Sequence, residues 1–259
     1  PPAVITGGTA RFEGRDLLAL GEAELRAVRW RRIAMVFQSA MDSLNPVITV
    51  GEQITDTLRA HGVAGDRAAR DRAAELLELV GLPRGLSGTY AHRLSGGMRQ
   101  RLGIAIALAL EPSLLILDEP TTALDVIVER EILQRIRELQ RRQGFAVLFI
   151  THDLARMLQV SDRVAVFYAA RLVELGPAGD LRRAPRHPYT QGLLRAFPSV
   201  HGGTVELASI PGAPPSLSDP PAGCRFHPRC PLAVDLCRQR DPELRRLAPG
   251  HSAACHLAE

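Results

Sequence analysis

The sequence predicts an α/β protein with a mostly parallel sheet, an inserted α-helical subdomain and a small cysteine-containing C-terminal appendage. Strand and helix patterns alternate after Pro112, as they do when helices connect parallel strands. The strands are continuous apolar runs such as LLIL (114–117) and AVLFI (146–150), which are typical of a sheet covered on both faces. Only helical patterns occupy residues from about 45 to 95, so this segment is the predicted insertion.

The first half of the chain contains two predicted strands, the insertion and the helix that follows it. Residues 4–12 alternate between apolar and polar side chains, and residues 33–37 form a stronger apolar run. Asp66 is expected to be the N-cap of the second helix in the insertion, and Gly81 is expected to end it. The helices predicted in this half cover residues 51–60, 66–80 and 95–110.

The second half continues the α/β pattern and then changes in composition. Its predicted strands are 114–117, 146–150, 163–168 and 171–175, with helices over 126–143 and from Asp153. Past Ser199 an extended linker is indicated by five prolines, and all four cysteines follow it. We therefore expect a main domain over residues 1–198 and a C-terminal extension over residues 199–259. The prolines are 211, 214, 215, 220 and 221.

Composition is that of an ordinary soluble globular protein, with 46% hydrophobic and 23% charged residues. The net charge of +4 comes from arginines scattered among acidic residues, and only 4% of residues are aromatic, so nucleic-acid binding is not predicted. No apolar run reaches the roughly 18–20 residues that cross a bilayer, and the first residues show no signal-peptide pattern. We expect a cytosolic location, and the missing initiator methionine suggests that the start of the chain is cut.

Two adjacent carboxylates, Asp118 and Glu119, follow the predicted strand LLIL directly. Carboxylates at the end of a buried strand are costly to desolvate without a cation or strong donors. The carboxyl ends of strands are also where open α/β sheets bind ligands. One interpretation gives Asp118 a Mg²⁺ ion, held through water, and makes Glu119 the base that acts on an attacking water. The alternative is a helix-capping Asp-Glu pair before Pro120.

A serine followed by two glycines, Ser95-Gly96-Gly97, begins the predicted helix over 95–110. Glycines let backbone N–H groups approach an anion, and a helix N-terminus adds a favourable dipole. Alone, such a sequence is more often a turn. Its position ahead of the strand that ends in Asp118 favours phosphate binding.

Two further polar residues follow predicted strands. His152 comes just after AVLFI, where an imidazole could reach a γ-phosphate, although a lone histidine there is more often structural. Gln38 follows the strand over 33–37 and could contact a metal ion or the attacking water.

In order and spacing, these segments resemble the conserved motifs of ABC-transporter ATPases: Gln38 the Q-loop, LSGGM the signature, LLILDEP the Walker B strand, Ala123-Leu124-Asp125 the D-loop and His152 the switch histidine. More narrowly, the chain resembles the oligopeptide/dipeptide importer ATPases. The segments that carry this resemblance are FEGRDLLAL, FQSAMDSLNPVITVGEQI, LSGGMRQR, DEPTTALDV and GCRFHPRCP. In the third of these segments, Met98 occupies a position where other ABC families usually have glutamine.

The resemblance implies an ABC-type P-loop NTPase core and a peripheral subunit on the cytoplasmic face of the cell membrane. ATP and Mg²⁺ are the implied cofactors, with Glu119, His152 and Gln38 as catalytic residues and Asp118 and Gln38 at the metal. Residues 95–98 and Asp125 would contact the ATP of a second, homologous ATPase subunit paired head-to-tail. Transmembrane permeases would contact the helical insertion and the Gln38 loop, and an extracytoplasmic solute-binding protein would act indirectly.

One departure from the family pattern concerns the phosphate-binding loop. The chain contains no lysine, so a G-x-x-x-x-G-K-[ST] loop is absent from these 259 residues. In the family, this loop and the aromatic residue that stacks on adenine precede the position of Pro1. We therefore expect an ATPase that lacks its N-terminal Walker A region.

The four cysteines, Cys224, Cys230, Cys237 and Cys255, lack the C-x₂-C pairs of zinc ribbons, and disulfides are disfavoured in the cytosol. Thiolate ligation of a [4Fe–4S] cluster is chemically reasonable, and the resembled family implies one for some members. Zinc and unligated thiols are the alternatives.

Three functions follow from the sequence. The first is an ATP-hydrolysing subunit that energises an importer of peptides or a related solute such as nickel. The second is a degenerate subunit that binds permeases and a partner ATPase without hydrolysing ATP. A soluble ABC ATPase of DNA repair or translation is disfavoured, because the chain has one cassette and no coiled-coil insertion.

Overall fold

The computed structural model describes residues 4–38, 44–63, 65–120, 124–196 and 209–259. The chain folds into two compact units, Pro1–Thr151 and His152–Glu259. The predicted domain boundary at 198/199 lies outside the described residues. The division between the two compact units falls after Thr151. No helix among the described residues is long and apolar enough to span a membrane.

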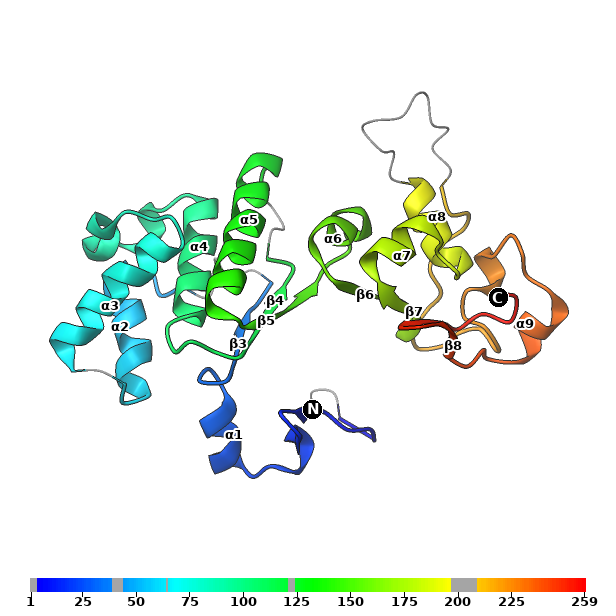
Figure 1. Cartoon of the computed structure of the whole chain (residues 1–259), viewed down its shortest axis with the longest axis horizontal. Coiled ribbons are helices and arrows are strands. Elements are labelled where there is room, and N and C mark those ends of the chain that lie inside the picture. Colours follow the sequence, from blue (N-terminus) through cyan, green and yellow to red (C-terminus); the bar gives the residue numbers. More distant parts are fainter. Residues whose placement is uncertain (1–3, 39–43, 64, 121–123, 197–208) are drawn as a thin grey trace. The chain divides into compact units, whose positions relative to one another are not determined.

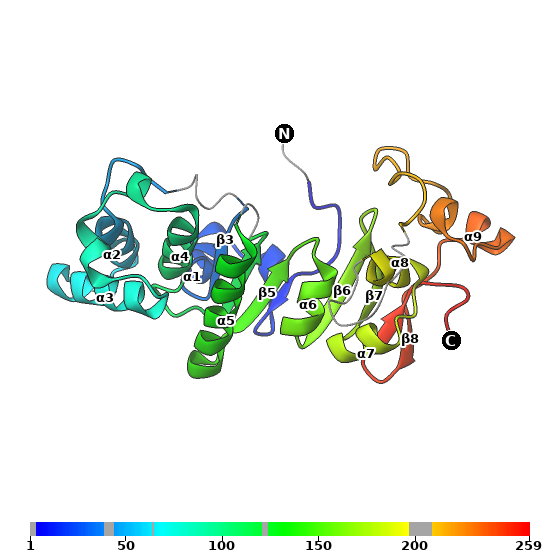
Figure 2. The ribbon, with the colours of Figure 1, turned by 90° about the horizontal axis from the view of Figure 1, so that it is seen from above.

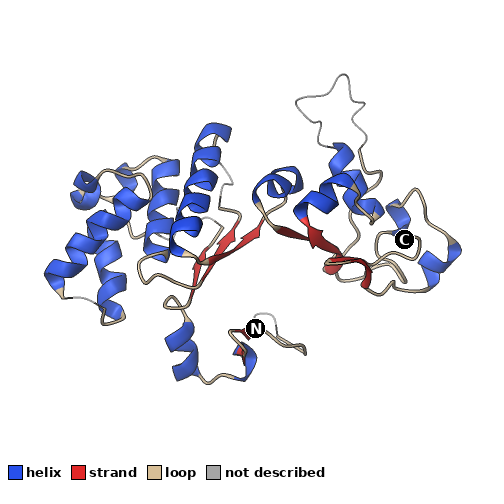
Figure 3. Ribbon diagram, in the orientation of Figure 1, coloured by secondary structure: helices blue, strands red, loops and turns tan. Residues whose placement is uncertain are grey.

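The first unit contains a three-stranded parallel sheet and a group of helices, which Figures 1 and 3 show as ribbons. The strand order is β3-β4-β5, and the register pairs Val36 with Leu117 and Asp118 with Ile150. The elements of this unit are β1 (Arg11–Phe12), β2 (Arg15–Asp16), a 3₁₀ turn (Leu17–Ala19), α1 (Glu22–Val28), β3 (Ile33–Val36), α2 (Val50–Ala60), α3 (Asp66–Leu79), 3₁₀ turns (Arg84–Gly88 and Ala91–Arg93), α4 (Gly96–Ala107), β4 (Leu114–Asp118), α5 (Val126–Gln143) and β5 (Ala146–Ile150).

The core of this unit lies between one face of the sheet and the helices. Leu115 and Leu117 of β4 are fully buried, together with Leu102 of α4 and Ile132 of α5. In Figure 2, α4 and α5 lie side by side, and α2 and α3 lie beyond α4. The helical insertion predicted over about 45–95 thus corresponds to α2, α3 and the two 3₁₀ turns after them.

Three expectations for this unit were wrong in detail. Residues 4–10 form no strand, because no described strand pairs with them, and only Arg11–Phe12 pairs in a short hairpin with β2. The N-cap of α3 is Gly65, and Asp66 is the first helical residue. The sheet is well covered on one face only: Leu148 is 49% exposed and Ile150 46% exposed, because nothing among the described residues covers that face of β5.

The second unit is an antiparallel sheet of strand order β6-β7-β9-β8, with helices packed on it. The predicted strands 163–168 and 171–175 correspond to β6 (Arg163–Tyr168) and β7 (Arg171–Pro177). Strand β9 (His251–Ala253), which follows the proline-rich segment, extends their sheet, since Glu174 of β7 pairs with Ala253 of β9. The elements are α6 (Leu154–Val160), β6 (Arg163–Tyr168), β7 (Arg171–Pro177), α7 (Ala178–Arg183), α8 (Pro188–Ala196), a 3₁₀ turn (His227–Arg229), α9 (Asp235–Gln239), β8 (Arg245–Ala248) and β9 (His251–Ala253).

Candidate functional site

The candidate site lies at the carboxyl ends of the parallel strands. Gln38 comes two residues after the end of β3, while Asp118 is the last residue of β4 and Glu119 follows it. Because β3 and β4 are parallel and in register at Val36 and Leu117, these three polar residues follow strands that end at the same edge. Gln38 is exposed, and the two carboxylates are half-buried. This edge is where an open α/β sheet binds its ligand.

The backbone of Glu119 is held in an unusual conformation. Its φ is 47°, in the left-handed region that costs a residue with a side chain about 1–3 kcal/mol. Its N–H donates to the carbonyl oxygen of Ile150 at 2.9 Å, so the backbone of β5 fixes this turn. Strain retained at the end of a central strand is typical of functional sites.

The helix-capping alternative for the Asp118-Glu119 pair is not supported by the helix that follows. Asp125 is the N-cap of α5, and its Oδ1 accepts hydrogen bonds from the N–H groups of Ile127 at 3.1 Å and Val128 at 2.9 Å. Leu124 and Asp125 of the expected D-loop are described, and Ala123 lies outside the described residues.

Helix α4 begins at Gly96, and Ser95, which was expected to be the first helical residue, is its N-cap. The hydroxyl oxygen of Ser95 accepts from the N–H of Met98 at 3.3 Å, and Ser95 itself is exposed. Met98 is partly buried and packs against the core of the first unit. A Cβ atom at Gly97 would lie 2.6 Å from Cγ1 of Val128. The second glycine therefore lets the N-terminal turns of α4 and α5 pack together, a reason that sequence reasoning did not find.

His152 follows the end of β5 by two residues, as predicted, and begins the second compact unit. Its side chain is exposed. Its backbone carbonyl accepts from the N–H of Leu154 at 3.2 Å at the start of α6.

The four cysteines carry free thiols in the second unit. Burial raises the pKa of Cys224, the N–H of Phe226 lowers it, and the charges of Cys237, Cys230 and Cys255 raise it further.

The same part of the structure does not support the predicted iron–sulfur site. Among the described residues, no group of three or more histidine, cysteine or acidic side chains is arranged to hold a metal ion.

A buried polar network in the second unit was missed at the sequence level. Glu174 is fully buried; its Oε1 contacts Nε2 of His251 at 2.7 Å and accepts from the N–H of Arg186, also at 2.7 Å. Its Oε2 accepts from the N–H of His187 at 3.0 Å, and Nδ1 of His187 accepts from the N–H of Tyr189 at 3.0 Å. Burial lowers the pKa of His187 to about 4. The sequence signal that could have indicated this network is Glu174, which lies among apolar residues in the middle of β7.

Comparisons with known proteins agree with these motifs. The model of the ABC transporter family matches residues 2–122, and the model of the oligopeptide/dipeptide transporter C-terminal region matches residues 173–237. The chain is 48% identical over 256 residues to a probable peptide ABC transporter ATP-binding protein of Sinorhizobium fredii, covering 98% of this chain and 76% of the relative.

Two further relatives and a solved structure are similar. The chain is 44% identical to the dipeptide transport ATP-binding protein DppD of Escherichia coli, covering 98% of this chain and 79% of the relative. It is 45% identical to the oligopeptide transport ATP-binding protein OppD of Bacillus subtilis, covering 97% of this chain and 71% of the relative. Among solved structures, the dimeric ATP-binding cassette MJ0796 bound to ADP and Pi is 28% identical, with a TM-score of 0.60 over 67% of this chain and 74% of that chain.

Proposed function

The chain belongs to the ABC-transporter ATP-binding proteins, in the group that carries the oligopeptide/dipeptide transporter C-terminal region, and we propose that it hydrolyses ATP to energise peptide import. The observation that carries the proposal is the edge of the β3-β4-β5 sheet, where Gln38, Asp118 and Glu119 follow parallel strands. The names of the similar proteins, which are peptide and dipeptide transport ATP-binding proteins, support the choice of cargo. Nickel or another related solute is the alternative cargo.

Each polar residue at this edge receives a role in the proposed reaction. Asp118 would hold Mg²⁺ through water, since carboxylate oxygens suit this ion. Glu119 would orient or deprotonate the attacking water, and Gln38 would contact the metal ion or that water. His152 would contact the γ-phosphate. Most of the acceleration of phosphoryl transfer comes from such positioning and from electrostatic stabilisation.

The N-terminus of α4 is the proposed contact with the ATP of a partner ATPase. Ser95 is exposed there, and a helix N-terminus offers N–H groups and a positive dipole to a phosphate. We assign Gly96, Gly97, Met98 and Asp125 to the same contact, and the packing of the N-terminal turns of α4 and α5 at Gly97 and Val128 supports this assignment. The dimeric state of MJ0796 supports pairing between two cassettes. We propose that the partner is homologous to this chain rather than identical.

The phosphate-binding loop decides between this proposal and a degenerate subunit. These 259 residues contain no lysine and therefore no G-x-x-x-x-G-K-[ST] motif. If the native subunit carries such a loop upstream of Pro1, it grips ATP at its own site. If the gene encodes none, the chain would offer only its α4 surface to the partner's ATP. The upstream coding sequence separates the two.

Permease contacts are assigned to the helical subdomain of about 45–95 and the Gln38 loop, on the cytoplasmic face of the membrane. Val47 is 76% exposed and Tyr90 41% exposed on this part of the first unit, which supports a contact surface there. The solute-binding protein would act through the permeases. For the chain as a whole we propose an ATPase domain over 1–198 and an extension over 199–259.

An iron–sulfur cluster in the extension is kept as a proposal. It is supported only by the four cysteines of the extension and the chemistry of their thiols, since thiolates are the ligands of such clusters. When bound, such a cluster would cross-link the extension, which is a structural role.

Peptide uptake by cells tests the proposed function. Cells in which the gene for this chain is deleted should fail to grow on a dipeptide that supplies a required amino acid, and the intact gene should restore growth. Uptake of the free amino acid is the control and should be unchanged. Normal dipeptide uptake in the deletion strain, or loss of nickel uptake alone, would contradict a peptide cargo.

A further inference from the structure

The segment 44–49, which leads into α2, presents one apolar side chain to solvent. Val47 is 76% exposed, whereas Leu44 is buried and Val50, the first residue of α2, is fully buried. A single exposed valine is common on protein surfaces and indicates nothing by itself. The hydrogen bonds that hold the backbone on both sides of Val47 are the informative feature.

Gln53 of α2 binds this loop through its side-chain amide. Its Oε1 accepts from the N–H of Asn45 at 3.0 Å, and its Nε2 donates to the carbonyl oxygen of Asn45 at 3.2 Å. Nε2 also lies 3.5 Å from the carbonyl oxygen of Ile48. Gln53 is only 8% exposed, and its amide contacts the residues on either side of the Pro46-Val47 pair.

The two residues between these contacts are held as well. The N–H of Val47 donates to Oδ1 of Asn45 at 3.1 Å, and the ring of Pro46 restricts its φ to about −65°. The carbonyl oxygen of Pro46 lies 3.2 Å from Nδ1 of His92. The folded chain therefore displays Val47 on a loop whose shape is already set.

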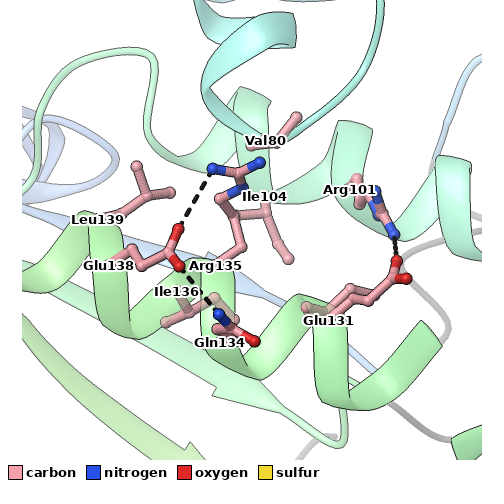
Figure 4. A pocket seen from close by; sticks show the side chains of 10 residues that line it. Val80, Arg101, Ile104, Glu131, Gln134, Arg135, Ile136, Glu138 and Leu139 are labelled. Atoms are coloured by element: carbon pink, nitrogen blue, oxygen red, sulfur yellow. Dashed lines mark hydrogen bonds and ion pairs between the residues drawn. The ribbon is translucent and has the colours of Figure 1, made fainter. Parts of the chain in front are cut away.

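Charged side chains elsewhere in the first unit pair with each other instead. In the pocket between the end of α3, α4 and α5, Arg101 pairs with Glu131 (Figure 4). In the same pocket Arg135 pairs with Glu138 at 3.3 Å. These ion pairs join one helix to another or lie along one helix. Gln53 differs from them, because its amide bonds to the backbone of a loop and holds that loop in one conformation.

Helix α2 does not depend on the amide of Gln53 for its own start. Thr49 is its N-cap, and the Thr49 hydroxyl oxygen accepts from the N–H of Glu52 at 3.3 Å. Asn45 is exposed, so water can replace the amide at its backbone groups. Loss of the Gln53 amide should therefore loosen the loop while α2 stays folded.

We propose that Gln53 is a positioning residue, which holds Val47 ready to enter a small apolar pocket of a permease subunit. The inference rests on the proposed function, which assigns the permease contacts to this part of the chain. An apolar anchor on a preformed loop binds more tightly than the same side chain on a loop that is ordered only on binding, because folding has already restricted the backbone.

Binding of the native subunit to its permeases, reconstituted in lipid nanodiscs, tests the proposal. Val47→Ala should weaken binding about tenfold, since it removes the buried contact of two methyl groups. Gln53→Leu should also weaken binding about tenfold, since the loop must then be ordered on binding. Val63→Ala is the matched control and should bind normally, because Val63 is 50% exposed but follows the other end of α2.

The double variant of Val47→Ala and Gln53→Leu separates positioning from an independent contact. If Gln53 acts only through Val47, the double variant should bind about as tightly as the weaker of the two single variants. Additive losses would overturn the positioning role. Val47 is exposed, so Val47→Ala keeps the fold and still tests the anchor if Gln53→Leu does not fold.

Hydrogen exchange in the free subunit gives a second readout. The amide hydrogens of Asn45 and Val47 should exchange faster in Gln53→Leu than in the unmodified subunit, while the melting temperature changes little. Unchanged exchange at both amides would contradict the positioning role.

Empty nanodiscs of the same lipids distinguish the permeases from the membrane surface as the partner. Equal binding to empty nanodiscs would overturn the proposal. If the unmodified subunit does not bind the permeases, the proposed function and this inference both fail. Normal binding by the folded Val47 and Gln53 variants would overturn this inference alone.

Discussion

A Cβ atom on Gly97 would lie 2.6 Å from Cγ1 of Val128, so the first turns of α4 and α5 are in direct contact. Ser95 caps the first of these helices and Asp125 caps the second. The two N-termini therefore present their N–H groups and positive dipoles side by side. This packing requires glycine at position 97.

Gly97→Ala should destabilise the first unit by about 1–3 kcal/mol, the usual range for an overpacked site. Val128 is β-branched and has one strongly preferred rotamer in a helix, so its methyl group cannot easily move away. The free energy of unfolding, measured in urea, gives the change.

Two further variants control this measurement. Gly88→Ala should cost much less, because a Cβ atom there would meet no atom within 4 Å and the position is exposed. Adding Val128→Ala to Gly97→Ala should recover part of the loss, since it removes the contacting methyl group. Equal effects of Gly97→Ala and Gly88→Ala would contradict the packing role.

Asp125→Ala should cost about 0.5–2 kcal/mol of stability, because the N–H groups of Ile127 and Val128 lose their acceptor. Asp125→Asn should be close to neutral, since asparagine caps helices about as well as aspartate. Urea unfolding of the two variants measures the cap. A large loss in Asp125→Asn would show that the charge of Asp125, rather than its capping oxygen, stabilises the helix.

The buried imidazole of His187 should make stability depend on pH. Its pKa is lowered to about 4 by burial, against the ordinary 6.5, so the unfolded chain takes up a proton first as the pH falls. Stability should therefore be unaffected by this group above pH 6.5 and should fall between pH 6.5 and 4, by up to roughly 3 kcal/mol.

His187→Asn should flatten this part of the stability profile, because asparagine does not titrate and its side-chain oxygen can still accept from Tyr189. His92→Asn, at an exposed position, is the matched control and should leave the slope unchanged. The free energy of unfolding at a series of pH values provides the profile. An unchanged slope in His187→Asn would remove His187 from this effect.

Protein purified without oxygen should contain iron and absorb broadly near ~400 nm if the cysteines ligate a cluster, as thiolate-bound iron–sulfur centres do. Replacing Cys237 with serine should abolish both signals. Elemental analysis that finds no iron, in colourless protein prepared anaerobically, would exclude the cluster, and one equivalent of zinc would favour the alternative metal.

The sequence predicted the elements that depend on local signals. The strands 114–117, 146–150 and 163–168 are confirmed almost to the residue, because each is an apolar run bounded by turn residues. The helix over 126–143 is confirmed at both ends, since Asp125 caps it and Gly144 has the left-handed φ of 75° that ends helices. The ABC ATPase fold is also confirmed, by the solved cassette that the structure matches.

Features that depend on contacts between distant residues were not predicted. The strands β8 and β9 are short, and they exist because β9 pairs with β7 from nearly 80 positions earlier in the chain. The network around Glu174 joins His187 and His251, which no local pattern connects. The prediction for residues 4–10 was wrong for the opposite reason: the segment alternates like a strand, but no strand among the described residues pairs with it.

Replacing Glu119 with glutamine most directly tests the central claim that the carboxylate at the end of β4 acts on the γ-phosphate of ATP. The measurement is ATP turnover by a subunit that carries a phosphate-binding loop, assembled with its permeases and partner ATPase. Glu111→Gln is the matched control, because Glu111 has a similar left-handed φ of 53° and lies before β4, away from the site. The account predicts a fall of about 10²-fold or more for Glu119→Gln, as expected for loss of a general base, and normal turnover for Glu111→Gln. Unchanged turnover in Glu119→Gln would contradict the account.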